Sequence, residues 1–439
     1  MRKFVILLLF CGIVGVSSAQ TARQEIDSHP HIAMATHSVY ASPYYFKEIA
    51  EAPKGFKPFY ISHYGRHGSR YESANYLVDD FLGVFRKADS LGLLTPKGQE
   101  VKAFAEKYHK AHDGRIGELT RLGAEQHKGI ARRMYHRFKD VFIKGAIVES
   151  RASIARRCIM SMAMFNESLK ECEPMVETRM DTGDCYQAVI RPTSRYNPAF
   201  PKDIDDKTMG KGEPWHKKMV EWGAKQDVSR ILNQLFTDTK ALDYKGGDFG
   251  LVHDIYKRLA FAQNLGWYDR TLLDSIFTAD ERYMMYLYDN YNWYNTRMGA
   301  SSDYSRRILR NIRPLVEDIV NCADQAIAGK NSAVANLRFG HDYYLLALMG
   351  GLNYNEYRSD LDISDIEKFG EVWRGYKAIT MASNFQMVLY RSKKSDDILV
   401  RFLHNEDDVT LPIASDMAPF YKWEDAKSYM FGRLEYLAK

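Results

Sequence analysis

The chain has 439 residues, with 61 lysines and arginines against 56 aspartates and glutamates. This length exceeds the roughly 250–300 residues at which a single hydrophobic core stops growing, so we expect a large domain with a second lobe. The nearly balanced charge argues against the clustered basic face of a nucleic-acid-binding protein, and any anion site must be local.

The first element is a predicted secretory signal peptide at residues 1–19. Arg2 and Lys3 precede an apolar run that ends in small residues at Ser17 and Ala19, which is the order that such peptides show. The run is shorter than the ~20 residues needed to span a bilayer. We therefore expect cleavage after Ala19 and an exported protein, periplasmic or extracellular, without a stable membrane span.

Strand and helix patterns alternate over the next part of the chain. Residues 57–65 (KPFYISHYG) read as a buried strand, and apolar residues then recur at helical spacing up to about residue 111, with a break at 95–98. A helix capped by Thr120, a strand within 141–150 and a helix within 153–169 follow. This order predicts an α/β fold, a sheet covered by helices on both faces.

The middle of the chain changes character. Residues 198–300 have helical periodicity with little strand signal, whereas helix and then short strands return after residue 301. We therefore predict one α/β domain in two parts, 20–197 and 301–439, interrupted by a mostly helical lobe at 198–300.

Cysteine and histidine spacing gives little sign of a metal site. Cys172 and Cys185 are the closest pair in sequence for a disulfide, although spacing alone cannot establish the geometry of a bridge. No CxxC pair occurs, and His109 and His112 have helical spacing for a metal but no evident third ligand. We expect neither a metal nor another cofactor.

Chemistry is concentrated in the stretch YISHYGRHGSRY, residues 60–71. Arg66 and Arg70 are suited to grip a tetrahedral oxyanion through paired donors, and Gly68 allows the backbone to approach a ligand. His67 lies between the arginines, where a neutral ring nitrogen can attack phosphorus. Surface arginines around a turn histidine are the competing interpretation.

A second polar pair, His341 and Asp342, follows the apolar run that ends at Gly340. Open α/β sheets place ligands at the carboxyl ends of their strands, so both polar segments are expected at one edge. A histidine there can bind the anion, and an aspartate can protonate a leaving alcohol. A helix cap is the alternative for an isolated His-Asp pair.

Together these residues resemble the histidine acid phosphatase family, the larger-chain branch of the histidine phosphatases. The resemblance rests on Arg-His-Gly-Ser-Arg at 66–70 with His341 and Asp342, and it extends in the family's order to segments 117–127, 151–161, 323–327 and 403–413. It implies that His67 becomes phosphorylated and that Asp342 donates the proton. The phosphate would be held by Arg66, Arg70, Arg157 and His341, with Arg156 as the neighbour most easily confused with Arg157.

Within the family, the Arg157-Cys158 pair is similar to the bacterial multiple inositol polyphosphate phosphatases and phytases. That subgroup usually has His-Ala-Glu where this chain has His341-Asp342, so the donor is one residue earlier and one methylene shorter. Glu72 stands where many members have proline; a carboxylate at the entrance would disfavour highly anionic substrates, or it caps a helix.

The resemblance implies an exported phosphomonoesterase that acts on a small phosphorylated substrate, with phytate or another inositol polyphosphate preferred. An acidic pH optimum is expected, because Asp342 must be protonated while His67 is neutral. The alternatives are a broad-specificity acid phosphatase and a non-catalytic protein that binds phosphorylated glycans. The smaller mutase-like branch is disfavoured by the chain length and the downstream His-Asp pair.

Overall fold

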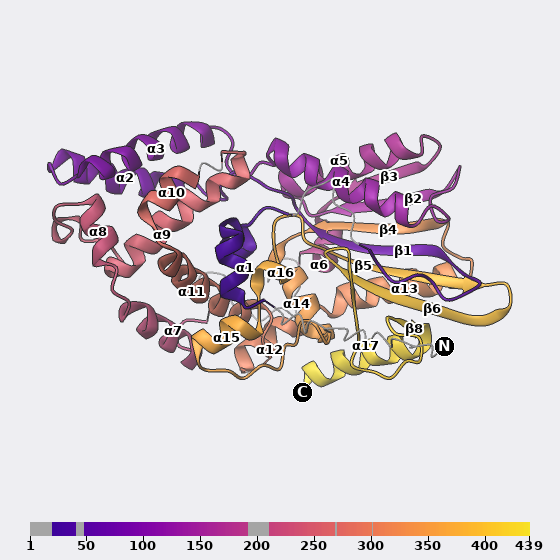
Figure 1. Cartoon of the computed structure of the whole chain (residues 1–439). Coiled ribbons are helices and arrows are strands. Elements are labelled where there is room, and N and C mark those ends of the chain that lie inside the picture. The colour runs from indigo at the N-terminus through magenta and orange to yellow at the C-terminus, as the bar shows by residue number, and fades with distance from the viewer. Residues whose placement is uncertain (1–19, 41–47, 192–209, 268–269, 301) are drawn as a thin grey trace, which may run out of the picture.

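A computed structural model describes residues 20–40, 48–191, 210–267, 270–300 and 302–439. A sheet with its covering helices forms one side of the molecule, and a layered group of helices forms the other (Figure 1). The predicted signal peptide lies outside the described residues. No helix within those ranges is long and apolar enough to cross a membrane.

The strands are β1 (Phe56–Arg66), β2 (Ile147–Ala152), β3 (Glu177–Thr182), β4 (Ala333–Gly340), β5 (Asn384–Ser392), β6 (Ser395–His404), β7 (Asp407–Val409) and β8 (Phe420–Lys422). They lie in the order β3-β2-β4-β1-β5-β6-β7, and β8 pairs with β6. Strands β3, β2, β4 and β1 are mutually parallel, whereas β5, β6, β7 and β8 pair antiparallel. The parallel strands therefore bring their carboxyl ends to one edge.

The helices before the middle of the chain are α1 (Ala22–Ser28), η1 (Pro30–His37), α2 (Tyr76–Ser90), α3 (Pro96–His112), α4 (Arg121–Arg137), α5 (Arg156–Cys172), η2 (Asp184–Tyr186), α6 (Gln187–Ile190), α7 (Pro214–Ala224), α8 (Ser229–Leu235), η3 (Lys240–Leu242) and α9 (Gly247–Phe261). The later ones are η4 (Ala262–Leu265), α10 (Arg270–Ile276), α11 (Ala279–Arg297), α12 (Asp303–Arg310), α13 (Arg313–Ile327), α14 (Asp342–Leu352), α15 (Ile366–Val372), α16 (Gly375–Ala378) and α17 (Trp423–Ala438).

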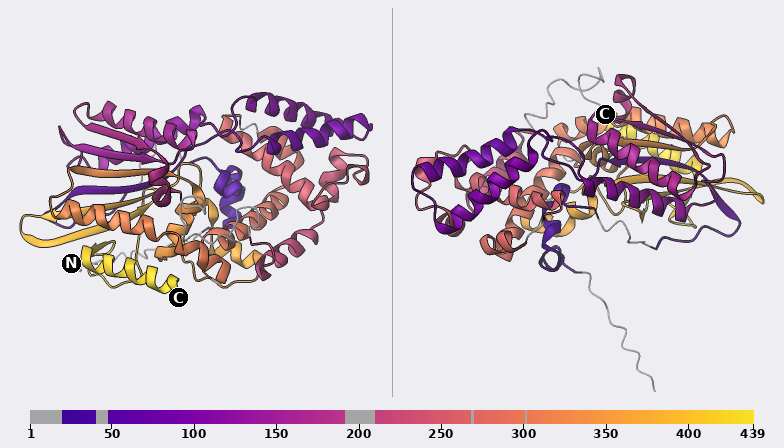
Figure 2. Two further views of the ribbon diagram at one scale, coloured as in Figure 1. Left: turned by 180° about the vertical axis from the view of Figure 1, so that it is seen from behind. Right: turned by 90° about the horizontal axis from the view of Figure 1, so that it is seen from above.

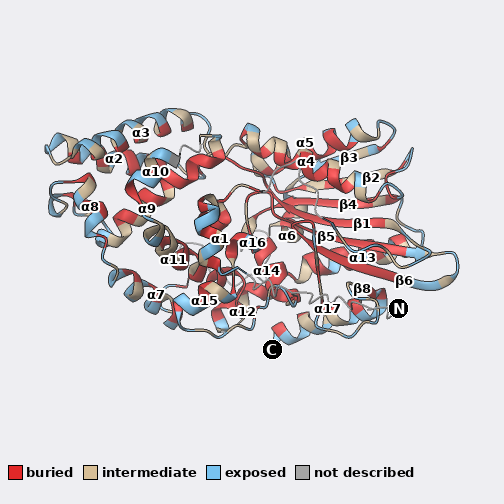
Figure 3. Cartoon of the chain, viewed as in Figure 1, coloured by how far each residue is buried: buried red, intermediate tan, exposed pale blue. Residues whose placement is uncertain are grey.

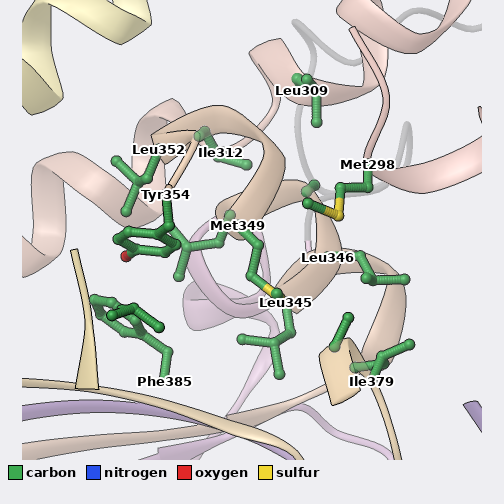
Figure 4. Packing of buried hydrophobic residues seen from close by; sticks show 14 of the residues in the cluster. Met298, Leu309, Ile312, Leu345, Leu346, Met349, Leu352, Tyr354, Ile379 and Phe385 are labelled. Atoms are coloured by element: carbon green, nitrogen blue, oxygen red, sulfur yellow. The ribbon is translucent and has the colours of Figure 1, made fainter. Parts of the chain in front are cut away.

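Helices cover both faces of the sheet, as the sequence predicts. Side chains alternate along β1, so that Tyr60 and Tyr64 join a hydrophobic cluster with α13, α14 and α17, while Ile61 joins the cluster with α4 and α5. The central strands are buried along most of their length (Figure 3). In the first cluster, Leu345 and Met349 of α14 pack toward Tyr354 and Phe385 (Figure 4).

The helical side is built from two separate stretches of the chain. Residues of α2 and α3 share one hydrophobic cluster with α8, α9 and α10. The sequence pattern assigns α2 and α3 to the α/β domain, because they directly follow β1, but their apolar faces pack on the later helices. The predicted boundary at 197–198 lies outside the described residues.

The cysteine pairing expected from sequence spacing is not formed. Cys158, Cys172, Cys185 and Cys322 are all free thiols. Cys172 lies at the end of α5, whereas Cys185 is exposed in η2 beyond β3. An entire strand thus separates two residues that are close in sequence.

Candidate active site

The two polar segments meet because their strands are neighbours. Arg66 at the end of β1 lies in register with Gly340 at the end of β4. The backbone N–H of His67 then donates to the carbonyl of Gly340 at 3.0 Å. A side chain at position 340 would collide with the hydroxyl of Tyr64, since a Cβ built there lies 2.0 Å from it. Close strand packing therefore requires this glycine.

Arg66 and Asp342 form a buried ion pair at the centre of the site. Nη2 of Arg66 lies 2.6 Å from Oδ2 of Asp342, and the arginine side chain has no exposed surface. Burial lowers the pKa of Arg66 to about 10, so the guanidinium remains positive at neutral pH. The backbone carbonyl of Thr36 also accepts from Arg66, and the Thr36 hydroxyl donates to Asp342 at 3.4 Å. No sequence signal identified Thr36 as a site residue.

His67 has the protonation state that a nucleophile needs. Its Nδ1 lies 2.9 Å from the carbonyl oxygen of Gly68. Because a carbonyl only accepts, Nδ1 carries the proton and Nε2 keeps its lone pair. The pKa of His67 lies well below its usual value, because the ring is buried and because Arg157 and Arg66 oppose a further positive charge.

The loop after His67 is held by the close approach of two backbone segments. A Cβ on Gly68 would lie 2.4 Å from the carbonyl oxygen of Gly123 in α4. The N–H of Gly68 donates to Oγ of Ser161, and the N–H of Ser69 donates to Oε1 of Gln126 at 2.8 Å. This packing fixes the backbone that carries His67.

His341 and Arg157 lie together on the other side of His67. The rings of His67 and His341 are edge to face, with centroids 5.7 Å apart. Nε2 of His341 lies 3.1 Å from Oγ of Ser153, and its Nδ1 lies 3.5 Å from Nη2 of Arg157. Burial and the nearby positive charge of Arg157 lower the pKa of His341 well below its usual value.

The structure separates the two adjacent arginines of α5. Arg157 turns toward His341, whereas the side chain of Arg156 is 70% exposed and pairs with Glu118 at 3.1 Å. The helical turn that follows Ala155 explains this, since neighbouring residues on a helix point about 100° apart. Arg157 is therefore the one of the pair that faces the site.

Three guanidinium groups, those of the buried Arg66 and Arg70 and of the half-buried Arg157, converge with unused donors. Within the described part of the chain, Nε of Arg66, Arg70 and Arg157 has no hydrogen-bond partner. Arg70 donates from Nη1 to the carbonyl of Tyr71 at 2.9 Å, and its guanidinium lies 5.5 Å from the centre of the Phe261 ring. Buried donors normally have a hydrogen-bond partner. Three Nε–H donors without a partner around one histidine therefore point to an anion as their acceptor.

Asp342 is ionised at rest. Burial opposes its ionisation, but the charge of Arg66 outweighs burial and holds the pKa of Asp342 well below its usual range. Its Oδ1 also accepts from the N–H of Tyr343 at 2.8 Å. The protonated aspartic acid required by the expected chemistry is thus not the resting form.

Glu72 is neither an entrance carboxylate nor a helix cap. It is buried, accepts from the hydroxyl of Tyr108 at 2.9 Å, and forms an ion pair with Arg258 of α9. Burial opposes its ionisation, but Arg258 and Arg70 lower its pKa below the usual value. Arg258 belongs to no sequence motif, so the sequence does not predict its ion pair with Glu72.

His109 and His112 contact other partners in the structure. His109 lies 3.0 Å from Asp79, whereas the buried His112 contacts the carbonyl of Tyr108 through Nδ1. Across the described ranges, no group of three or more histidine, cysteine or acidic side chains is arranged to hold a metal ion.

Solved structures share this fold over nearly the whole chain. The multiple inositol polyphosphate phosphatase of Bifidobacterium longum in complex with inositol hexasulfate superposes with a TM-score of 0.71 at 19% identity, over 91% of this chain and 97% of that chain. Its complex with phosphate gives 0.66 with the same identity and coverage. The phytase from D. castellii gives 0.67 at 14% identity, over 92% and 85% of the two chains.

The comparisons of sequence found no match, in contrast to the comparison of structures. No protein-family model matches the chain, and no curated protein matches it in sequence. The structural likeness confirms the fold that the resemblance to histidine acid phosphatases implies. At these identities the likeness concerns the fold, and the chemistry depends on the residues described above.

Proposed function

We propose that the chain is an exported phosphomonoester hydrolase that works through a phosphohistidine and prefers inositol polyphosphates such as phytate. The observation that carries this proposal is the neutral His67, with Nε2 unprotonated, among the unused donors of Arg66, Arg70 and Arg157. Neighbours of the same fold are an inositol polyphosphate phosphatase and a phytase, which supports the substrate class.

The first chemical step transfers the phosphoryl group to His67. Nε2 attacks phosphorus while the bond from phosphorus to the leaving oxygen breaks, and the guanidinium groups neutralise charge on the equatorial oxygens. The leaving oxygen takes the proton of Asp342. A water molecule then attacks the phosphorus atom of the phosphohistidine and gives a proton to Asp342. The bond between phosphorus and Nε2 breaks, so that inorganic phosphate leaves and His67 is neutral again.

Substrate binding supplies the protonated aspartic acid. A phosphate that engages Arg66 adds negative charge beside Asp342 and weakens the ion pair that keeps this carboxylate ionised, so its pKa rises. As pH increases, the protonated fraction of Asp342 falls, while His67 is already neutral. We therefore expect a rate that declines above neutral pH, as an acid phosphatase requires.

Trapping the intermediate tests the mechanism. Brief reaction with radiolabelled substrate, followed by alkaline quenching to preserve acid-labile phosphohistidine, should leave label on the wild-type chain and none on His67→Ala. His109→Ala is the matched control, because His109 is an exposed histidine on α3, and it should be labelled normally. Label that persists in His67→Ala would place the nucleophile elsewhere.

The substrate preference and the alternatives are separated by turnover. Phytate, sugar phosphates and an aryl phosphate should all be hydrolysed, with phytate preferred. Similar rates on all three without phytate preference would favour a broad-specificity acid phosphatase. Binding of phosphorylated glycans without any turnover would favour the non-catalytic protein.

Export and domain division belong to the same proposal. The predicted cut after Ala19 supports export, and the helical lobe at 198–300 provides a roof for a wide substrate. Fractionation of a native host, with amino-terminal sequencing of the mature protein, should find it outside the cytoplasm and beginning at Gln20.

A further inference from the structure

The segment η1 joins the site from the side of the helical lobe. It packs against both α9 and α11, and in the view from behind it lies between the sheet and the helical side of the molecule (Figure 2). Its residue Thr36 contacts both Arg66 and Asp342. The next residue, His37, therefore lies beside the phosphate clamp, which consists of the guanidinium groups of Arg66, Arg70 and Arg157.

His37 and Arg70 share one aromatic neighbour. The ring of His37 meets the ring of Phe261 edge to face, with centroids 5.4 Å apart, and the guanidinium of Arg70 lies 5.5 Å from the centre of the same ring. The His37 side chain is half-buried and makes no hydrogen bond within the described residues. Its ring nitrogens are therefore available to a ligand at the site.

Lys257 extends this group along α9. His253, Lys257 and Phe261 recur at intervals of four, so they share one face of the helix. Nε2 of His253 lies 3.0 Å from Oδ1 of Asp289 in α11, so His253 contacts one oxygen of a carboxylate whose charge also acts on Lys257. Lys257 is half-buried, and within the described ranges its ammonium group makes no hydrogen bond or salt bridge.

The acidic groups around these residues are already engaged. Asp342 forms an ion pair with Arg66, and Glu72 forms ion pairs with Arg258 and Arg70. Asp289 contacts His253. Arg157 and Lys257 form no salt bridge within the described residues, and Asp289 is the carboxylate whose charge reaches Lys257 and His37. The pKa of His37 reports the resulting positive field, because burial and the charges of Arg70 and Lys257 lower it well below its usual value.

We propose that His37 and Lys257 form a second anion subsite, beside the clamp, that holds another phosphate group of a polyphosphorylated substrate. This inference rests on the proposed function and assigns the preference for polyphosphates to two residues outside the phosphatase motifs. A monophosphate fills only the clamp of Arg66, Arg70 and Arg157. A second phosphate on the same ring also gains the charge-assisted donors of Lys257 and His37.

Two single variants test the subsite by selectivity. In Lys257→Met and His37→Gln, KM for phytate should rise about tenfold, the loss expected for one charge-assisted contact. The kinetic constants for an aryl monophosphate should stay within about twofold of wild type, because the clamp is unchanged. Lys217→Met is the matched control, since Lys217 is an 80% exposed lysine of α7, and both substrates should behave as with wild type.

The outcomes separate the subsite from the reaction itself. Equal losses on both substrates, or no loss on phytate, would overturn the subsite while leaving phosphohistidine trapping intact. If the wild type hydrolyses neither substrate, calorimetry with inositol hexasulfate still decides the matter. Binding about tenfold weaker in Lys257→Met than in wild type or Lys217→Met supports the subsite, and equal or absent binding refutes it. Thermal melting of each variant verifies folding.

Discussion

At the scale of single residues, the proposed mechanism depends on the charge of Asp342. The resting carboxylate neutralises Arg66, and in the proposed mechanism the incoming phosphate replaces it as the partner of Arg66. The Asp342 side chain then serves first as a counterion and afterwards as an acid. This proposed dual role reconciles a strongly ionised resting aspartate with protonation of a leaving group at acidic pH.

The variant Asp342→Asn isolates the acid role, because asparagine keeps the shape and cannot donate the catalytic proton. We expect kcat for phytate to fall about 10²–10⁴-fold, the usual contribution of general acid catalysis. An aryl phosphate with an acidic leaving group should lose far less. Steady-state kinetics on both substrates measure the difference, and an equal loss on both would contradict the assignment.

Two buried histidines beneath the site predict how stability depends on pH. His63 packs between the rings of Phe165 and Phe339, and His127 contacts Phe339. Burial lowers the pKa of each to about 3. The unfolded chain binds these protons near pH 6.5, so stability is complete above that pH and is lost as pH falls from 6.5 toward 3.

The variant His63→Phe should remove the part of the stability loss at low pH that comes from His63. Between pH 7.5 and pH 4.5, the free energy of unfolding of the wild type should fall by about 2–3 kcal/mol more than that of the variant, at ~1.4 kcal/mol per pH unit below 6.5. Urea denaturation at the two pH values measures this. Parallel losses in both proteins would mean that His63 does not contribute.

The sequence singles out residues that the structure brings together where they form a dense local pattern. The run from Arg66 to Arg70 and the His341-Asp342 pair are visible because each follows a strand. Thr36 and Arg258 are not visible, because Thr36 acts largely through its carbonyl and Arg258 lies within an ordinary amphipathic helix. Their partners become apparent only when distant segments are placed together.

At the scale of elements, the Glu72 ion pair ties the loop after β1 to the helical lobe. Glu72 is held by Arg258 of α9 and by Tyr108 of α3. Replacing Glu72 alone leaves Arg258 buried without its partner, which typically costs about 3–5 kcal/mol.

A double-mutant cycle measures this tie. Glu72→Met should lower the free energy of unfolding by about 3–5 kcal/mol, whereas Glu72→Met with Arg258→Met should recover at least ~1 kcal/mol, because the buried charge of Arg258 is removed together with its partner. Urea denaturation provides the values. Additive losses would show that the two side chains do not interact energetically.

The sequence patterns predict the amphipathic helices, the strand at 57–65 and a strand that ends at Gly340, but not β3 or β5. The edge strand β3 is largely exposed, so it has no buried face to produce a pattern. The buried strand β5 includes Asn384 and Gln386, which interrupt its apolar run and hydrogen-bond to each other at 2.9 Å. Polar residues that hydrogen-bond to one another inside a sheet interrupt the apolar pattern by which a buried strand is predicted.

At the scale of the whole molecule, the fold class followed from the order of strands and helices, and the structural neighbours bear it out. The placement of α2 and α3 did not follow, because an apolar helix face does not say which later segment will cover it. The candidate site lies where both regions meet: the ends of β1 and β4 place Arg66, His67 and Asp342, and the helical side provides Arg258 beside them.

The pairing of β1 with β4 has a consequence for the growing chain. The hydroxyl of Tyr60 donates a hydrogen bond to Oδ1 of Asn336, which lies 276 positions later in the chain. Strand β5, which pairs with the other edge of β1, is synthesised later still. At about 5–20 residues per second, a ribosome needs on the order of tens of seconds between these strands. Both edges of β1 stay unpaired during that interval, so the nascent chain must avoid aggregation before the loop that carries His67 can form.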